Sequence, residues 1–356
     1  MSVPGAPTIP NLPTSPVAAD LTAIVPAFNE EATIEATVRS LLAQTFPPQR
    51  ILVVDDCSTD ATAERARRLG ATVVSPPSNT GSKAGAQSFA LREVSTSYVM
   101  AVDADTTLDP DAVETILPAL RDPAIAAACG FVVPRRTRTV WERGRYIEYL
   151  LAFSFFKRVQ DHFGAPLISS GCFSVYRTET LAEVGGWSAR TLAEDVDLTW
   201  TLYQAGHGVR FVPAAVSRPL EPHSFAFVRA QLTRWSHGLM QNVRLHWRRI
   251  LHLRFLRSVV AVLFWDAVVA PVVFLLVLPV LAVLVTPWAL LGYAIDGPAL
   301  MVPVLVEAVS RRELGRALVS MPAFFVLRMA NAWFMLAAVW GELLLRRPLT
   351  VYEKGH

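Results

Sequence analysis

The sequence predicts an α/β domain, with a mainly parallel β-sheet and helices on both of its faces, followed by an amphipathic interface helix and transmembrane helices. Three observations lead to this fold class. Short apolar runs alternate with stretches of helical periodicity over the first part of the chain. A stretch rich in arginine and free of acidic residues follows at 228–257. Beyond it, long apolar stretches contain almost no charged residues.

The composition divides the chain into two parts. Of its 356 residues, 52% are apolar and 18% are charged, with a mean hydropathy of +0.36, whereas a typical soluble domain has about 25% charged residues. Residues 231–356 contain 13 Lys and Arg against 6 Asp and Glu, and residues 1–230 contain 20 against 24. This composition excludes a disordered or low-complexity protein and argues against an entirely soluble one.

The first residues and the cysteines indicate the compartment. Residues 1–20 have five prolines, no basic residue and no apolar run, so we interpret them as a disordered leader rather than a secretory signal. The cysteines are odd in number and far apart, which fits neither a disulfide framework nor a zinc site: Cys57, Cys129 and Cys172. We interpret them as reduced thiols in a domain that faces the cytosol.

The elements of the α/β part are predicted in chain order from local patterns. Apolar runs predict strands at 21–26, 50–54, 71–74 and 98–102. Helical spacing of apolar residues between them predicts helices at 30–42, 61–69 and 83–94. Strands that alternate with helices in this way form a parallel sheet covered on both faces. Ligands bind beyond the carboxyl ends of such strands, where the sequence places Glu30, Asp55, Asp56, Asp103 and Asp105.

Residues 228–257 predict a basic amphipathic helix. The stretch has seven arginines and no acidic residue, and apolar side chains recur among them close to helical spacing. Such a helix is typical of one that lies on an anionic membrane surface. Nucleic-acid binding is the alternative, but one arginine-rich helix that leads directly into an apolar stretch favours the bilayer.

Two apolar stretches predict two to four membrane crossings. Residues 258–295 contain one charged residue, Asp266, and form either one tilted span with an interfacial piece or a hairpin that turns near Pro279. Residues 317–345, in which only Arg328 and Glu342 are charged, form a second span. The segment 300–309 is too short to cross unaided. The arginines that flank these stretches prefer the cytoplasmic side of a membrane.

The sequence thus predicts four parts of the chain. These are a leader (1–20), an α/β domain (21–227), an interface helix (228–257), and a transmembrane region with a short basic tail (258–356).

Two acidic pairs and one trio of side chains on a helix face carry candidate chemistry. Asp103 and Asp105 can share a divalent cation with a diphosphate, because Mg²⁺ and Mn²⁺ prefer carboxylate and phosphate oxygens. Alone, such a pair is more often a helix cap or a solvated loop. Glu194 and Asp195 stand at a helix start, where a carboxylate serves the helix dipole or acts as a general base. A third set shares one helix face, as an interfacial anchor or a binding site does: Gln231, Arg234 and Trp235.

Taken together, these residues belong to an ordered series of motifs in which the chain resembles the family 2 glycosyltransferases. The resemblance covers about residues 21–250. Its motifs are 25–31 (VPAFNEE), 54–60 (VDDCSTD), 81–86 (GSKAGA), 103–105 (DAD), 193–197 (AEDVD) and 231–235 (QLTRW). The last, a Q-x-x-R-W pattern, is similar to that of membrane-integrated processive polysaccharide synthases, which make cellulose, chitin, hyaluronan or poly-N-acetylglucosamine. The tracts 192–202 and 231–241 look nearest to the poly-N-acetylglucosamine and chitin-oligomer branch.

The resemblance implies a GT-A catalytic domain that uses a UDP-sugar and Mg²⁺ or Mn²⁺. The catalytic residues would be Asp195 and Glu194, with Asp195 as the base that takes a proton from the acceptor hydroxyl in an inverting transfer. The nucleotide would be bound by Pro26, Phe28, Glu30, Asp55, Asp56, Lys83, Asp103 and Arg234, and the metal by Asp103 and Asp105. The acceptor would be bound by Gly171, Cys172, Gln231 and Trp235.

The expected protein is thus a multi-pass enzyme of the cell membrane, with a cytoplasmic catalytic domain, that adds sugars repeatedly to a growing polysaccharide. The alternative is transfer of one sugar to a lipid acceptor, such as polyprenyl phosphate or a glycolipid. A channel built from few helices would need a small partner subunit or a homo-oligomer. No nucleic acid is expected as a partner, and the retained acidic residues argue against a non-catalytic membrane scaffold.

Two positions depart from the family pattern. Ala193 stands where threonine is usual before Glu194, and Cys57 replaces a common glycine. The segment F-x-V-T-x-K-x-G is absent after Trp235, which argues against a cellulose synthase.

Overall fold

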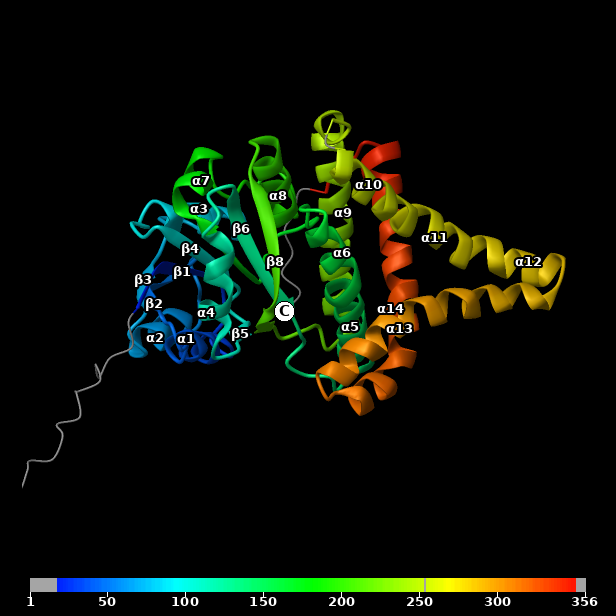
Figure 1. Cartoon of the computed structure of the whole chain (residues 1–356), viewed down its shortest axis with the longest axis horizontal. Helices are drawn as coiled ribbons and strands as arrows, with labels where there is room; N and C mark the ends of the chain where they lie inside the picture. The colour runs from blue at the N-terminus through cyan, green and yellow to red at the C-terminus, as the bar shows by residue number, and fades with distance from the viewer. Residues whose placement is uncertain (1–17, 253, 350–356) are drawn as a thin grey trace, which may run out of the picture.

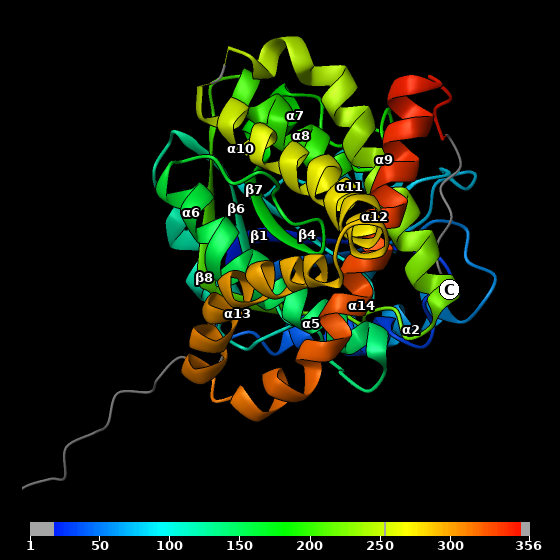
Figure 2. The same cartoon turned by 90° about the vertical axis from the view of Figure 1, so that its right-hand side faces the viewer.

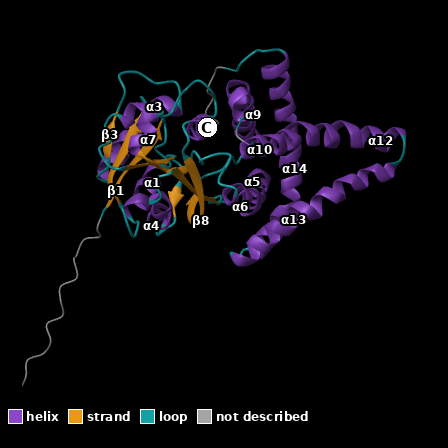
Figure 3. Ribbon diagram, turned by 45° about the horizontal axis from the view of Figure 1, so that its top comes forward, coloured by secondary structure: helices purple, strands orange, loops and turns teal. Residues whose placement is uncertain are grey.

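The computed structural model describes residues 18–252 and 254–349. Within them, an eight-stranded sheet with the order β3-β2-β1-β4-β7-β6-β8-β5 lies between helices, and the C-terminal helices stack beside this layered domain (Figure 1; Figure 3). The strands are β1 (Ala19–Ala27), β2 (Pro48–Asp55), β3 (Thr72–Val74), β4 (Tyr98–Val102), β5 (Thr107–Leu108), β6 (Ile125–Val132), β7 (Phe173–Arg177) and β8 (Gly208–Arg218). The helices that cover them are α1 (Ile34–Leu42), α2 (Thr62–Arg68), α3 (Lys83–Leu91), α4 (Ala112–Ile116), α7 (Thr178–Glu183) and α8 (Glu194–Gln204).

The first half of the sheet is parallel, as predicted. β1 pairs in parallel with β2 and β4, and β2 with β3. Apolar residues of β1 and β2 are buried on both faces of the sheet, so these strands are nearly continuous apolar runs. One face packs against α1, α2 and α4, and the other against α3, α7 and α8. Of the predicted leader, residues 1–17 lie outside the described residues, and the last two of its twenty residues belong to β1.

The second half makes the sheet mixed rather than mainly parallel. β7 lies between β4 and β6 and is antiparallel to both, and β5 is antiparallel to β8, whereas β6 and β8 are parallel. The reason is that α5 (Val140–Leu151) and α6 (Lys157–His162) leave the sheet before β7 returns to it. The regular alternation of strand and helix, on which the parallel prediction rests, ends at β4, because β5 follows β4 without a helix between them.

The predicted interface helix is α9 (Phe225–Ile250), which starts three residues earlier and ends seven residues earlier than predicted. Ser224 caps it by accepting a hydrogen bond from the N–H of Phe227. A second helix, α10 (Arg254–Phe264), follows instead of a continuation. α9 buries Val228 and Leu232 against Leu327 of α14 (Leu314–Ala338), so the helix packs on the C-terminal part as well as on the domain.

After α9 the chain forms a helical arm of two legs that project from the rest of the molecule (Figure 1; Figure 2). One leg contains α10, α11 (Ala270–Val272) and α12 (Leu278–Leu284), and the other is α13 (Gly292–Ser310). The predicted hairpin is present, but it turns after residue 284 and not near Pro279. Pro279 lies within a continuous helical stretch, directly after the π-helical turn Val273–Val277, so the helix passes through it without ending.

The last helix is a candidate membrane span. α14 continues through a π-helical turn to residue 344, and among the described residues Leu314–Leu344 is the one helix both long and apolar enough to cross a membrane. Residues 300–309, predicted to be too short, are the second half of α13. The number of crossings stays a prediction.

Candidate active site

A cavity of about 1230 Å³ lies where the carboxyl ends of the strands meet α9 and the C-terminal helices. Every predicted site residue lines it except Asp55. Ligand cavities usually measure roughly 300–1,000 Å³. This one therefore has room for a donor and an acceptor together.

Lys83 connects three of the predicted groups. Its ammonium group donates a hydrogen bond to the carbonyl oxygen of Gly171 at 2.8 Å, forms an ion pair with Asp103, and lies 3.6 Å from Oε1 of Glu194. Ser82 caps α3 by accepting a hydrogen bond from a backbone N–H of the first turn, so Lys83 is the first residue of the helix. A cation held here is placed to attract the diphosphate of a nucleotide near Asp103.

Asp103 and Asp105 concentrate negative charge beyond β4. Burial, with the nearby charges of Asp103, Glu30 and Glu221, raises the pKa of Asp105 to about 8. A divalent cation relieves such repulsion and prefers carboxylate oxygens, so the pair fits Mg²⁺ or Mn²⁺. Among the described residues, no three His, Cys, Asp or Glu side chains form a metal site. The other ligands would therefore come from substrate and water.

Asp195, near the start of α8, is held by backbone donors. Its Oδ1 accepts a hydrogen bond from the N–H of Val196 at 2.9 Å, and its Oδ2 accepts one from the N–H of Gly171 at 3.1 Å. A Cβ at position 171 would lie 3.1 Å from both Oδ2 of Asp195 and Nζ of Lys83, so glycine permits this contact. Burial and the charge of Glu194 raise the pKa of Asp195 to about 6, against the lowering effect of Lys83. A carboxylate with this pKa is ionised at pH 7 and suited to accept a proton.

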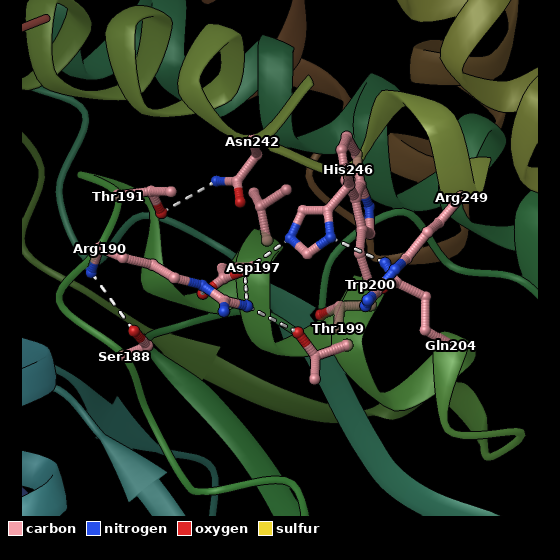
Figure 4. A network of polar contacts seen from close by, with 12 residues as sticks. Ser188, Arg190, Thr191, Asp197, Thr199, Trp200, Gln204, Asn242, His246 and Arg249 are labelled. Atoms are coloured by element: carbon pink, nitrogen blue, oxygen red, sulfur yellow. Dashed lines mark hydrogen bonds and ion pairs between the residues drawn. The ribbon is translucent and has the colours of Figure 1, made fainter. Parts of the chain in front are cut away.

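A network of polar contacts joins α8 to α9 (Figure 4). Asp197 accepts hydrogen bonds from Arg190 at 2.7 and 2.8 Å and contacts Nε2 of His246 at 2.6 Å. His246, on α9, also contacts the Gln204 amide at 2.7 Å. Arg190 and the hydrogen bonds hold the pKa of Asp197 below its ordinary value despite its burial. The network fixes the helix of the candidate base against the helix that carries Arg234 and Trp235.

The structure shows the surroundings of Ala193 and the backbone conformation of Cys57, the two residues that depart from the family pattern. A Cβ at Gly238 of α9 would lie 2.7 Å from the backbone nitrogen of Ala193 and 2.8 Å from its Cβ, so α9 packs directly on a small residue there. Asn242 strengthens the contact by donating a hydrogen bond to the Ala193 carbonyl at 3.0 Å. Cys57 has φ +65°, in the left-handed region that glycine adopts without strain.

On the nucleotide side, Asp56 and Asp55 have different surroundings. Asp56 is buried and accepts hydrogen bonds from the N–H and the hydroxyl of Thr80, both at 2.8 Å. Asp55 accepts one from the N–H of Ser58 at 3.2 Å and shapes the loop, so it does not line the cavity. Phe28 is 37% exposed at the cavity, as a ring that stacks on a base would be.

The first part of the chain matches a known protein family. Residues 22–185 match the model of the family described as glycosyl transferase family 2. The α/β domain is similar to this family over these residues. The match ends before Glu194, so the candidate base and the α9 residues lie beyond it.

Curated relatives share part of the chain. Poly-beta-1,6-N-acetyl-D-glucosamine synthase of Staphylococcus aureus (strain COL) is 29% identical over 223 residues, which cover 61% of this chain and 54% of that protein. The synthase of the same name from Staphylococcus epidermidis (strain ATCC 35984) is 28% identical over 60% of this chain and 53% of its own. The chain thus spans about half the length of the curated relatives it matches.

A solved structure shows the same fold over nearly the whole chain. The mannosyltransferase PcManGT from Pyrobaculum calidifontis, in complex with GDP-Man and Mn²⁺, has a TM-score of 0.61 and 21% identity, and covers 94% of this chain and 91% of that chain. Because the structural match covers 94% of this chain, it extends beyond residues 22–185 into the helices that follow. The likeness confirms the GT-A fold.

A buried guanidinium group that no motif predicted lies beside Gln231 and Trp235. Arg145 of α5 is 2% exposed, pairs with Glu148, lies 3.5 Å from Oε2 of Glu221, and donates a hydrogen bond to Oε1 of Gln231 at 2.7 Å. Its guanidinium carbon lies 4.7 Å from the ring centre of Trp235. Arg145 therefore holds two predicted acceptor residues, Gln231 and Trp235, in position.

The C-terminal helices also contribute to the lining. Asn331 of α14 donates a hydrogen bond to Glu148 at 2.5 Å, and Arg328 of α14 lines the cavity. The one signal for Arg328 in the sequence is its charge within an apolar stretch. The cavity is thus closed by α14 as well as by the domain.

Proposed function

We propose that the protein is a membrane-bound, metal-dependent, inverting glycosyltransferase that transfers sugar from a UDP-sugar to a hydroxyl group of a growing polysaccharide. The observation that supports this most is the place of Asp195. Its carboxylate has a pKa of about 6 and shares one cavity with Asp103, Asp105 and Lys83. A base and a diphosphate site that face the same space are what transfer to a hydroxyl requires.

Five of the predicted residues have a direct role in this proposal. The divalent cation held by Asp103 and Asp105 would neutralise the charge that develops on the leaving diphosphate. Arg234 on α9 adds positive charge on the same side, and Asp195 removes the proton of the attacking hydroxyl. Trp235 provides an apolar face on which a sugar ring of the acceptor stacks.

The relatives suggest the first donor to test. Their name indicates polymers of N-acetylglucosamine, so we propose UDP-N-acetylglucosamine as the donor. Because the similar mannosyltransferase was solved with GDP-Man, the donor panel should include that nucleotide sugar.

The membrane setting forms part of the proposal. α14 and the apolar arm would lie in the bilayer, and the exposed arginines of α9, which do not include Arg234, would face the anionic cytoplasmic surface. We propose a multi-pass protein of the cell membrane with its catalytic domain in the cytoplasm, alone or with a small partner subunit or a second copy.

The test is release of UDP or GDP from a panel of nucleotide sugars by the full-length chain in nanodiscs, with Mn²⁺ and then with chelator. We expect one donor to be preferred and activity to require the metal. Asp195→Asn should lower the rate by about 10²- to 10⁴-fold with Mn²⁺-dependent UDP affinity kept, whereas Asp105→Asn should lose that affinity. The proposal is wrong if no donor is turned over, or if Asp195→Asn matches the wild type.

A further inference from the structure

The cavity extends past Trp235 into the space bounded by the two legs of the arm and α14. There it is lined by Leu263 and Phe274 of the first leg and by Phe325, Met329 and Met335 of α14, which we call the apolar chamber. The legs diverge from the tip of the arm toward α14 (Figure 1). The chamber is continuous with the site where sugar is transferred.

A pair of opposite charges lies at the chamber. Among the described lining residues from α10 to α14, the charged ones are Asp266 and Arg328. Nη2 of Arg328 lies 3.5 Å from Oδ1 of Asp266, and the guanidinium carbon lies 5.4 Å from the ring centre of Phe274. Ionisable side chains among apolar helices are costly to bury and commonly mark a ligand path.

The chemistry of the chamber distinguishes a hydrocarbon from a saccharide. A sugar hydroxyl buried without a hydrogen-bond partner weakens binding by roughly 5- to 150-fold, and the five chamber side chains are apolar. Two polar side chains also line this part of the cavity, but the Tyr293 hydroxyl donates to the carbonyl oxygen of Phe274 and the Asn331 amide donates to Glu148. Each buried CH₂ group strengthens binding by roughly fourfold. The lining therefore selects against bare saccharide and in favour of an alkyl or prenyl chain.

We propose that the apolar chamber binds the hydrocarbon chain of a lipid-linked acceptor, with the Asp266–Arg328 pair at the level where this chain joins its polar head. This inference rests on the proposed function, since it takes the acceptor hydroxyl to approach Asp195 from the side of Trp235. A lipid acceptor is one of the two acceptor classes that the sequence leaves open, and a lipid that carries a growing saccharide fits both.

The arm offers a route of entry for such an acceptor. Its tip exposes large apolar side chains, with Val283 84%, Leu284 76% and Trp288 75% exposed, as expected of a segment surrounded by lipid. An acceptor in the bilayer would move between the legs without leaving the hydrocarbon. Its head would then meet the Asp266–Arg328 pair before it reaches Trp235.

The experiment compares acceptors that share a head and differ in tail. The full-length chain in nanodiscs receives the preferred donor, Mn²⁺, and either the methyl or the octyl glycoside of N-acetylglucosamine. Met329→Trp fills the chamber, Met335→Phe is a milder second block, and Val326→Trp is the control, because Val326 of α14 is 48% exposed and does not line the cavity. The readout is the octyl-to-methyl ratio of kcat/KM, in which partition into the same nanodisc cancels between variants.

We expect this ratio to fall at least about tenfold in Met329→Trp and by a smaller factor in Met335→Phe, with Val326→Trp equal to the wild type. Equal ratios in all four proteins, with sugar transfer and Mn²⁺-dependent UDP affinity intact, would overturn the chamber and leave the proposed function standing. Absence of UDP affinity and of donor turnover in the wild type would overturn the proposed function, and the chamber as an acceptor site with it.

Discussion

Replacement of Glu194 by glutamine should move the pH dependence of the enzyme without removing the base. Glu194 is 7% exposed and follows burial as the next cause that raises the pKa of Asp195. In Glu194→Gln this repulsion is gone, whereas Lys83 and Arg234 still lower the pKa of Asp195. The variant should therefore keep its activity to lower pH than the wild type.

The size of the effect follows from the pKa of Asp195, about 6 compared with an ordinary 3.8. A group with this pKa is about one tenth ionised at pH 5 and about nine tenths ionised at pH 7, so kcat/KM of the wild type should rise about tenfold over this range. As the pKa of Asp195 returns toward 3.8 in the variant, the rise should shrink to about twofold or less. Asp195→Asn should be slow at every pH.

The measurement is initial UDP release between pH 5 and 8 at constant ionic strength and saturating Mn²⁺. Glu183→Gln is the matched control, because the Glu183 side chain is 68% exposed on α7, outside the cavity lining. A flat wild-type profile would refute the raised pKa of the base. An inflection that Glu194→Gln leaves unmoved would refute the electrostatic role of Glu194.

Three further predictions concern the groups around the base. Arg145→Met should lower the free energy of unfolding by about 3–5 kcal/mol, because it leaves the buried Glu221 without its counter-ion. Thermal unfolding should show a Tm several degrees lower in this variant, whereas the control Arg143→Met should keep the wild-type Tm. An unchanged Tm in Arg145→Met would contradict the pairing. The pKa of Glu221 is already raised by burial, so its ionised form disfavours folding, and the loss in Arg145→Met should be smaller at pH 5 than at pH 8. Trp235→Ala should raise the KM for the acceptor and leave the KM for the donor unchanged. Trp247 is 50% exposed on the same helix, so the control Trp247→Ala should alter neither KM. A shift in the donor KM of Trp235→Ala would argue against an acceptor role. His246→Phe should cost about 1–3 kcal/mol of stability, because Asp197 loses a buried hydrogen-bond partner. The control is His252→Phe, since His252 is exposed. Equal Tm values in the two variants would show that the network does not fix α8 to α9.

The donor side of the site follows from the sequence because its geometry is local. Asp56 and Asp103 come directly after β2 and β4, Asp105 follows two residues later, and the carboxyl ends of these strands meet at one edge of the sheet. Asp55 is the exception. It belongs to β2 itself, so its side chain serves the backbone of the following loop instead of the cavity.

The acceptor side was less predictable, because its contacts join segments that are far apart in the chain. Arg145 and Gln231 are 86 residues apart, and Glu148 and Asn331 are 183 residues apart. Local periodicity carries no information on such pairs. The order of β7, β6 and β8 escaped prediction for the same reason, since antiparallel pairing with β4 depends on where α5 and α6 lead the chain.

The contacts of α14 make it part of the active site rather than only an anchor. Through Asn331 it holds Glu148 beside Arg145, and through Glu342 it accepts hydrogen bonds from Gln241 at 2.8 Å and contacts Nδ1 of His237 at 2.9 Å, both on α9. The helix that carries Arg234 and Trp235 is thus fixed by α8 on one side and by the candidate membrane span on the other. Because buried polar contacts of this kind resist displacement, a shift of α14 should be transmitted through α9 to the proposed acceptor residues. If α14 spans the membrane as proposed, the position of the protein in the bilayer is coupled in this way to the geometry of the site.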